Sequence, residues 1–229
     1  MVPENTIHPF TGFFVCRDNY LADPETVIEI ARSADIEWRR SPTFQGQRSS
    51  NLLRSPNVSI QAFSANFGNR LSYNVFRGIK NFQIDICFHK YDVPHLDDQD
   101  VKTGWIHIDH PYCMMAGMVY LNPDELHMET GTSIFHGRNR YSEEEEKTLI
   151  PIVQEFNKSA KTNDEYRKIW KENKERFPET IRAANVFNRL IAYDAFSQHR
   201  TNSFSVSDGT ERLTLLFYIT EYEFGDKNE

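Results

Sequence analysis

Several stretches of the chain place apolar residues at every second position, as strands do when one face is buried. The clearest lies between Phe82 and Phe88, where polar residues and one cysteine fill the intervening positions. This period of two predicts a strand. Further strands are expected at residues 11–20, Trp105–Asp109, Met114–Leu121, Thr132–His136, Arg189–Asp194 and Leu213–Tyr222.

Two segments in the first third of the chain repeat apolar residues at helical spacing instead. Asp23 is placed to cap a helix whose first turn contains Pro24. The apolar residues that share one face of this helix are Val27, Ile30, Ala31 and Ala34. A second helix is expected from Ile60 to Phe76, where phenylalanine, leucine and valine recur every four residues.

A polar segment from Ser142 to Phe177 interrupts the series of strands. Ser142 with Glu145, and Thr162 with Glu165, have the spacing of helix capping boxes, so we expect a helical insertion at about 142–177. Its inner stripe is expected to consist of Tyr166, Ile169 and Trp170. Strands on both sides of a polar helical segment predict an antiparallel barrel or sandwich with helices packed outside.

The composition favours one globular domain over residues 1–229. Hydrophobic residues make up 39% of the 229 positions, enough for a packed core. The net charge of −7 argues against nucleic acid as the main partner. No apolar stretch approaches the roughly 18 residues of a membrane span, and the three cysteines are widely spaced. We therefore expect a reduced, cytoplasmic setting with neither a membrane nor a nucleic-acid partner.

The most informative residues are the six from Trp105 to His110, with the sequence WIHIDH. In a strand, His107 and Asp109 point to the same face as Trp105, while the isoleucines between them point to the other. An imidazole and a carboxylate one pleat apart can reach the same cation. This pair therefore predicts two of the ligands of a metal ion.

A third ligand has to come from further along the chain. The histidines available are His110, His127, His136 and His199. We favour His199, because the chain before it leaves room for the several strands that a barrel needs. His136 follows His107 by only about two strands. It remains the alternative third ligand, and if it is not a ligand we expect it to be a hydrogen-bonded core or rim histidine.

Arg212 and Thr214 open the last predicted strand and project from the same face. An arginine that points into an apolar barrel needs an anion, and with a nearby hydroxyl it forms a fork for a carboxylate. The alternative is a surface arginine at a strand start, paired with Glu211 or Asp208.

Two imidazoles and one carboxylate on a barrel form the facial triad of non-haem iron(II) oxygenases. The order His-x-Asp, a distant His, then Arg-x-Thr resembles the iron(II)- and 2-oxoglutarate-dependent oxygenase superfamily. Within it the chain is most similar to the prolyl-4-hydroxylase-like branch and a group of bacterial and viral relatives. The similar stretches are DNYLADPETV, WIHIDH, GMVYLN with GTSIFHG, FNRLIAYDAFSQHR and RLTLLFYI.

This resemblance implies a mainly β fold with flanking helices, a double-stranded β-helix of the jelly-roll or cupin type. His107, Asp109 and His199 would be the catalytic iron(II) ligands. The far carboxylate of the cosubstrate 2-oxoglutarate would be bound by Arg212, Thr214 and Tyr120. Molecular oxygen would be the second cosubstrate, and the carboxylate of Asp109 favours oxygen insertion over halogenation.

The activity implied is hydroxylation of an unactivated C–H bond with release of succinate and CO2. The substrate would be an amino acid, a peptide or another small molecule, and no motif selects among them. Two alternatives stay open: a cupin-type metal enzyme that does not use 2-oxoglutarate, in which Arg212 is structural, and a non-catalytic barrel that serves as a binding module.

Overall fold

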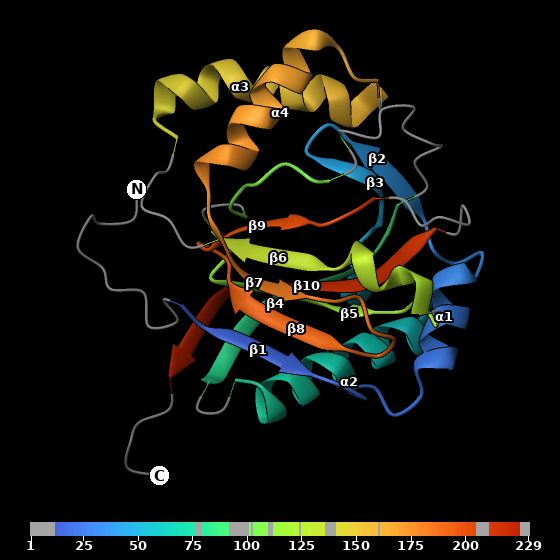
Figure 1. The fold of residues 1–229 in the computed structure, drawn as a ribbon. Coiled ribbons are helices and arrows are strands. Elements are labelled where there is room, and N and C mark those ends of the chain that lie inside the picture. Colours follow the sequence, from blue (N-terminus) through green and yellow to red (C-terminus); the bar gives the residue numbers. More distant parts are fainter. Residues whose placement is uncertain are drawn as a thin grey trace.

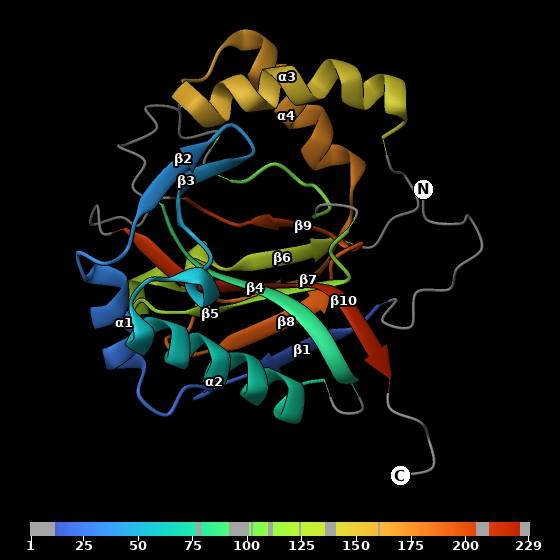
Figure 2. The same ribbon diagram turned by 180° about the vertical axis from the view of Figure 1, so that it is seen from behind.

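Two antiparallel sheets form the centre of the computed structural model, and the helices lie outside them (Figures 1 and 2). The structure describes residues 12–76, 79–91, 101, 103–109, 112–123, 125–135, 141–159, 161–204 and 211–224. The larger sheet has the order β1-β8-β5-β10-β4-β3-β2, and the smaller has the order β7-β6-β9. The strands are β1 (Phe14–Arg17), β2 (Trp38–Ser41), β3 (Phe44–Ser49), β4 (Ile79–Tyr91), β5 (Met115–Tyr120), β6 (Thr132–Phe135), β7 (Glu179–Ala183), β8 (Leu190–Asp194), β9 (Gln198–Thr201) and β10 (Arg212–Phe224). The helices are α1 (Pro24–Arg32), α2 (Val58–Asn74), α3 (Glu143–Ser159) and α4 (Asp164–Arg176), with shorter 3-10 turns at Leu52–Arg54 and Glu125–Thr130.

The two sheets pack against each other through buried side chains. One cluster joins Met118, Tyr193 and Leu216 of the larger sheet to Ile134 and Ala183 of the smaller. The opposite face of the larger sheet carries a second cluster, in which α1 and α2 cover the strands. This arrangement confirms the mainly β fold with flanking helices, and its facing sheets form the expected jelly-roll barrel.

Strand β10 lies between β4 and β5 and places polar residues inside the barrel. Thr214 is opposite His89 on one side and Tyr120 on the other. The alternate residues Leu213 and Leu215 belong to the cluster that α1 and α2 cover. Because directly opposite residues of a sheet share a face, the barrel interior receives a row of polar side chains along with its apolar ones.

Each of the two N-terminal helices begins directly after a residue whose side chain caps it. Asp23 accepts a hydrogen bond from the Thr26 amide at 3.1 Å, which confirms the predicted cap of α1. Helix α2 begins at Val58, slightly before the predicted start, because the side chain of Asn57 caps it.

Helices α3 and α4 occupy the segment in which the insertion was expected, on the side of the molecule away from α1 and α2 (Figure 1). The Ser142–Glu145 capping box is formed, with hydrogen bonds of 2.7 and 3.3 Å. The predicted box from Thr162 to Glu165 is wrong, since Asn163 caps α4 by accepting from the Tyr166 amide at 2.7 Å. The expected inner stripe is buried and consists of Tyr166, Ile169 and Trp170.

The strand predictions are confirmed for β4, β5, β8 and β10, and for the shorter β1. Strand β6 ends at Phe135, and His136 lies outside the described residues. The prediction of a strand at Trp105–Asp109 is wrong, because this segment makes a single bridge between His107 and His199. Within the part of the chain that the structure describes, no helix combines the length and apolarity needed to cross a membrane.

Candidate metal centre

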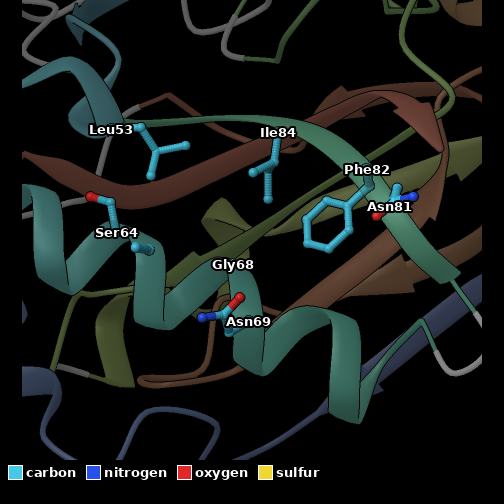
Figure 3. Close-up of a pocket in the computed structure, with 8 residues that line it drawn as sticks. Leu53, Ser64, Gly68, Asn69, Asn81, Phe82 and Ile84 are labelled. Atoms are coloured by element: carbon cyan, nitrogen blue, oxygen red, sulfur yellow. The ribbon is translucent and has the colours of Figure 1, made fainter.

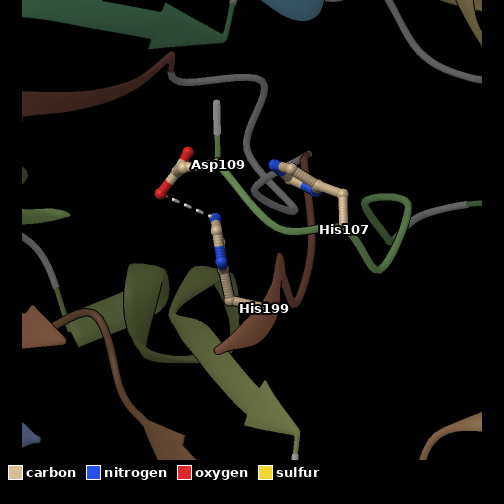
Figure 4. A group of neighbouring side chains, drawn as sticks. All are labelled: His107, Asp109 and His199. Carbon is tan, nitrogen blue, oxygen red and sulfur yellow. Dashed lines mark ion pairs between the residues drawn. The ribbon is translucent and has the colours of Figure 1, made fainter. Parts of the chain in front are cut away.

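His107, Asp109 and His199 lie together at one side of the smaller sheet (Figure 4). Their potential ligand atoms are all within 4.8 Å of one another. The backbones of His107 and His199 exchange two hydrogen bonds, of 3.1 and 2.8 Å, and the Asp109 amide donates to the Ala195 carbonyl at 3.2 Å. Backbone pairing therefore joins residues that are far apart in the sequence.

Both imidazole rings are oriented by a carbonyl oxygen two residues earlier in the chain. His107 Nδ1 is 2.8 Å from the Trp105 oxygen, and His199 Nδ1 is 3.0 Å from the Ser197 oxygen. Because a carbonyl oxygen only accepts hydrogen bonds, each Nδ1 carries a hydrogen, so Nε2 is the atom of each ring that could bind a metal. Metal-binding histidines usually have such an outer partner, which sets both the tautomer and the orientation of the ring.

One oxygen of the Asp109 carboxylate accepts no hydrogen bond from the part of the chain that the structure describes. Oδ2 is buried without a hydrogen-bond partner and lies 3.5 Å from His199 Nε2. Burying a carboxylate oxygen in this way is costly unless a cation compensates for it. Two imidazole nitrogens and one carboxylate oxygen without a hydrogen-bond partner are a ligand set that fits a divalent metal such as iron(II).

His107 lies on the open side of the centre, and its side chain is exposed. Its ring nevertheless lies deep enough among protein atoms that desolvation, and then the charge of His199, lower its pKa to about 4. The His107 imidazole is therefore neutral near pH 7 and has no proton to lose before it binds a metal.

Asn173 of α4 holds the segment that carries His107 and Asp109. Its side-chain oxygen accepts from the Ile106 amide at 2.9 Å, and its amide nitrogen donates to the Ile106 carbonyl at 3.1 Å. Asn173 is buried, although its neighbours in α4 are charged. The sequence analysis missed this residue, and it positions the metal-binding segment without contacting the metal ligands in the structure.

We expect Asn173→Ala to weaken metal binding, by less than the roughly 10- to 100-fold that loss of a ligand's own hydrogen-bond partner costs, because Asn173 holds the backbone between the ligands and not a ligand itself. The substitution leaves the Ile106 amide and carbonyl unpaired, at a cost of roughly 1–3 kcal/mol per buried group. Metal affinity and the free energy of unfolding of the metal-free protein should both be measured.

The matched control for this prediction is Asn157→Ala. Asn157 also bridges the insertion to the sheets, but it bonds to Gln45 and to the Pro42 carbonyl. This variant should lose stability and keep its metal affinity. Equal metal affinity in both variants would show that the contact between Asn173 and Ile106 does not support the centre.

Arg212 is buried, so the alternative of a surface arginine is wrong. Its Nε donates to the Thr130 carbonyl at 2.7 Å. The guanidinium carbon lies 5.1 Å from the ring centroid of Tyr91 and 5.5 Å from that of Tyr120. Among the described residues, no carboxylate forms an ion pair with Arg212, so the guanidinium is available to bind an anion.

Thr214 and Tyr120 are buried next to each other on neighbouring strands, as their opposite positions in the sheet require. The Tyr120 hydroxyl donates to Thr132 Oγ1 at 2.9 Å, and the Thr214 hydroxyl donates to the His89 carbonyl at 3.3 Å. A carboxylate bound beside Arg212 would therefore receive these hydrogens only after each hydroxyl has rotated away from its protein acceptor. The remaining candidates, His110 and His136, lie outside the described residues, as does the side chain of His127.

A separate pocket of about 340 Å³ lies between α2 and β4, on the outer face of the larger sheet (Figure 3). Its lining comes from the small residues of α2, the nearby Leu53 and the start of β4, and includes Gly68, Phe82 and Ile84. None of these side chains belongs to the metal centre, and the pocket adds nothing to its chemistry.

The fold of the barrel is that of the iron(II)- and 2-oxoglutarate-dependent oxygenases, and it carries a His-Asp-His group that could hold a metal. A prolyl-4-hydroxylase from Pseudomonas putida aligns over 92% of this chain and 94% of its own, with 14% identity and a TM-score of 0.50. The epimerase SnoN from nogalamycin biosynthesis aligns over 94% and 82%, with 14% identity and a TM-score of 0.53. AviO1 from Streptomyces viridochromogenes Tue57 aligns over 93% and 91%, with 10% identity and a TM-score of 0.51.

At these identities the solved structures show a shared fold and leave the reaction open. The chain belongs to the family of unknown function DUF6445, whose model matches residues 11–217. No curated protein matches the sequence.

Proposed function

We propose that this protein is an iron(II)- and 2-oxoglutarate-dependent oxygenase that hydroxylates an unactivated C–H bond of an amino-acid, peptide or small-molecule substrate. The observation that carries the proposal is the combination of two features on one barrel. The triad offers free donor atoms to a metal, and Arg212 offers a buried positive charge without an anionic partner among the described residues.

With iron(II) and 2-oxoglutarate bound, the centre would couple decarboxylation of 2-oxoglutarate to oxidation of the substrate, so that one atom of O2 enters succinate and the other enters the alcohol. The triad would hold the metal from one side and leave its other positions open. Arg212, with Thr214 and Tyr120, would bind the far carboxylate of 2-oxoglutarate. The aromatic rings beside Arg212 would keep water from competing for its charge.

The named relatives support this class of chemistry and differ in what they do. One is a prolyl-4-hydroxylase, and another is an α-ketoglutarate-dependent epimerase. The fold therefore does not select the substrate or the outcome. We favour hydroxylation, because Asp109 keeps a carboxylate on the metal where halogenating relatives have a small residue.

The proposal is tested by adding iron(II) and then 2-oxoglutarate to the protein without oxygen. We expect a weak visible charge-transfer band only after both additions, because it requires the cosubstrate to chelate iron. Zinc(II) in place of iron should give no band. After air is admitted, succinate should form.

The other outcomes identify the alternatives. Metal binding without a band or 2-oxoglutarate affinity would identify a cupin-type metal enzyme. A protein that binds neither iron nor 2-oxoglutarate would be a non-catalytic binding module.

A further inference from the structure

Arg48 of β3 points into the barrel from the strand next to β4. It lies opposite His89, which in turn lies opposite Thr214, and Thr214 lies opposite Tyr120. Residues in such a row share a face of the sheet, so Arg48 faces the same interior as Thr214 and Tyr120. No sequence motif marks this position.

Aromatic rings hold the guanidinium of Arg48. Its central carbon lies 4.2 Å from the ring centroid of Phe44 and 5.6 Å from that of Tyr218. Its Nε is buried without a hydrogen-bond partner, and among the described residues no carboxylate forms an ion pair with it. The rings orient Arg48 by cation–π contact and leave its hydrogen-bond donors available.

The metal centre borders the same interior face as Arg48. The Tyr218 ring below Arg48 lies in register with Ala116 and Tyr193, and the Tyr193 ring centroid is 4.8 Å from that of His199.

Burial disfavours the charged form, but interactions with Tyr218, then Cys87 and Tyr91, and last Asp109, raise the pKa of Arg48 above its ordinary value. A cation on the same interior face as a metal site opposes metal binding unless an anion joins them.

The sum of the charges in a barrel that holds a divalent metal and 2-oxoglutarate indicates the charge of the further ligand that would neutralise the site. A divalent metal brings two positive charges, Arg48 and Arg212 bring one each, Asp109 brings one negative charge, and 2-oxoglutarate brings two. One positive charge then stays unmatched in a part of the barrel where unpaired charge is costly. The nearby Asp85 does not neutralise it, since it is exposed and accepts a hydrogen bond from Asn51.

We propose that Arg48 binds a carboxylate of the primary substrate, either of a free acid or of a peptide C-terminus. The inference rests on the proposed function and narrows its substrate class to anionic molecules. The planar fork of an arginine suits a carboxylate, and the position of Arg48 beside the triad would hold the bound molecule next to the metal.

The test compares two acids with their amides on the protein loaded with zinc(II) and saturated with 2-oxoglutarate. The probes are N-acetylleucine and an acetylated pentapeptide that ends in leucine, each with a free or an amidated carboxyl group. Isothermal titration calorimetry should show at least one acid binding about 10- to 100-fold more tightly than its amide, as expected for hydrogen bonds to a charged group. The pair that shows the preference distinguishes a free acid from a peptide terminus.

Arg48→Gln should remove the preference for the acid and leave 2-oxoglutarate affinity unchanged. Arg48→Lys keeps the charge without the fork, so it should retain part of the preference. The matched control is Arg39→Gln, because Arg39 is the β2 neighbour of Arg48 but is exposed and paired with Glu37. This control should behave as the wild type does.

Three results would overturn the proposal: equal affinity of wild type for both acids and their amides, an unchanged preference in Arg48→Gln, or a more than 10-fold loss of 2-oxoglutarate affinity in that variant. The last result would assign Arg48 to the cosubstrate. Failure of the proposed function is seen separately, as a wild type that does not bind 2-oxoglutarate. In that case the comparison of acids with amides is repeated without 2-oxoglutarate. The zinc ion is equally accessible to the probes in wild type and in Arg48→Gln, so a difference in acid preference between these two proteins reports on Arg48.

Discussion

Asp109→Ala and His199→Ala are each expected to lose bound iron and all turnover. Each substitution removes one of three ligands, and the remaining pair cannot form a facial triad. The fold should survive, because the partner that the described structure gives Asp109 Oδ2 is His199, another residue of the same centre, in an ion pair of 3.5 Å. Iron stoichiometry after dialysis, together with thermal unfolding of the metal-free protein, measures both effects.

The control for these ligand variants is Asp85→Ala. Asp85 is another carboxylate of the larger sheet, but it is exposed and bonded to Asn51. We expect its removal to leave iron stoichiometry at the wild-type value. Iron bound at wild-type stoichiometry in His199→Ala, with loss in His136→Ala instead, would show that His136 is the third ligand.

Arg212→Ala should weaken 2-oxoglutarate binding by about 30-fold to several thousand-fold. Removing one partner of a buried, charge-assisted pair costs roughly 2–5 kcal/mol, because the other charge is left unmatched. Arg212→Lys should lose less, but it should not restore full affinity, since an ammonium lacks the planar fork. The measurement is a titration of 2-oxoglutarate into the iron-loaded variants without oxygen, and iron affinity should hardly change.

A second buried arginine serves as the control for the Arg212 variants. Arg200 contacts Thr103 and lies over the ring of Phe135. Arg200→Ala should lower stability and leave 2-oxoglutarate affinity intact. If Arg212→Ala binds 2-oxoglutarate as the wild type does while Arg200→Ala does not, the cosubstrate carboxylate is bound by Arg200 and Arg212 is structural.

The strands that were predicted from alternating apolar and polar residues are those that bury one face against the helices or against the other sheet. Strands β4 and β10 bury their apolar residues beneath α1 and α2. The alternation of apolar and polar residue types in these strands therefore matches the alternation of buried and less buried positions. The unpredicted strands β2, β3, β7 and β9 carry arginine or glutamine at several positions and lack this alternation. Their backbones pair because neighbouring strands are already in place, which residue types alone do not reveal.

The wrong prediction at Trp105–Asp109 has a specific cause. The residues alternate as a strand does, but Asn173 takes both the amide and the carbonyl of Ile106. These groups therefore cannot pair with a strand on that edge. On the edge facing β9 the register is lost on both sides of His107, since the Gly104 amide donates to Thr201 and the Asp109 amide to Ala195, so the segment makes one bridge and no ladder. A similar competition between neighbouring residues placed the cap of α4 at Asn163 rather than at Thr162.

The sequence predicted the residues of the candidate site whose chemical types are informative by themselves. His107, Asp109 and His199 have the donor atoms of a metal site, and the structure brings them together. Arg48 and Asn173 were missed because their surroundings, QGQRSS and KENKER, read as solvent-exposed segments. Only the pairing of β3 with β4, and the packing of α4 on Ile106, give these two residues a role.

If Asn173→Ala weakens metal binding as expected, the contact between Asn173 and Ile106 links the insertion and the metal centre thermodynamically. Because such coupling is reciprocal, any stabilisation of α4 in its docked position raises metal affinity, and bound metal stabilises the docked helix by the same free energy. A molecule that touches only the outside of α3 or α4 could therefore tune the centre without entering the barrel. The insertion would in that case act as an allosteric element of the protein.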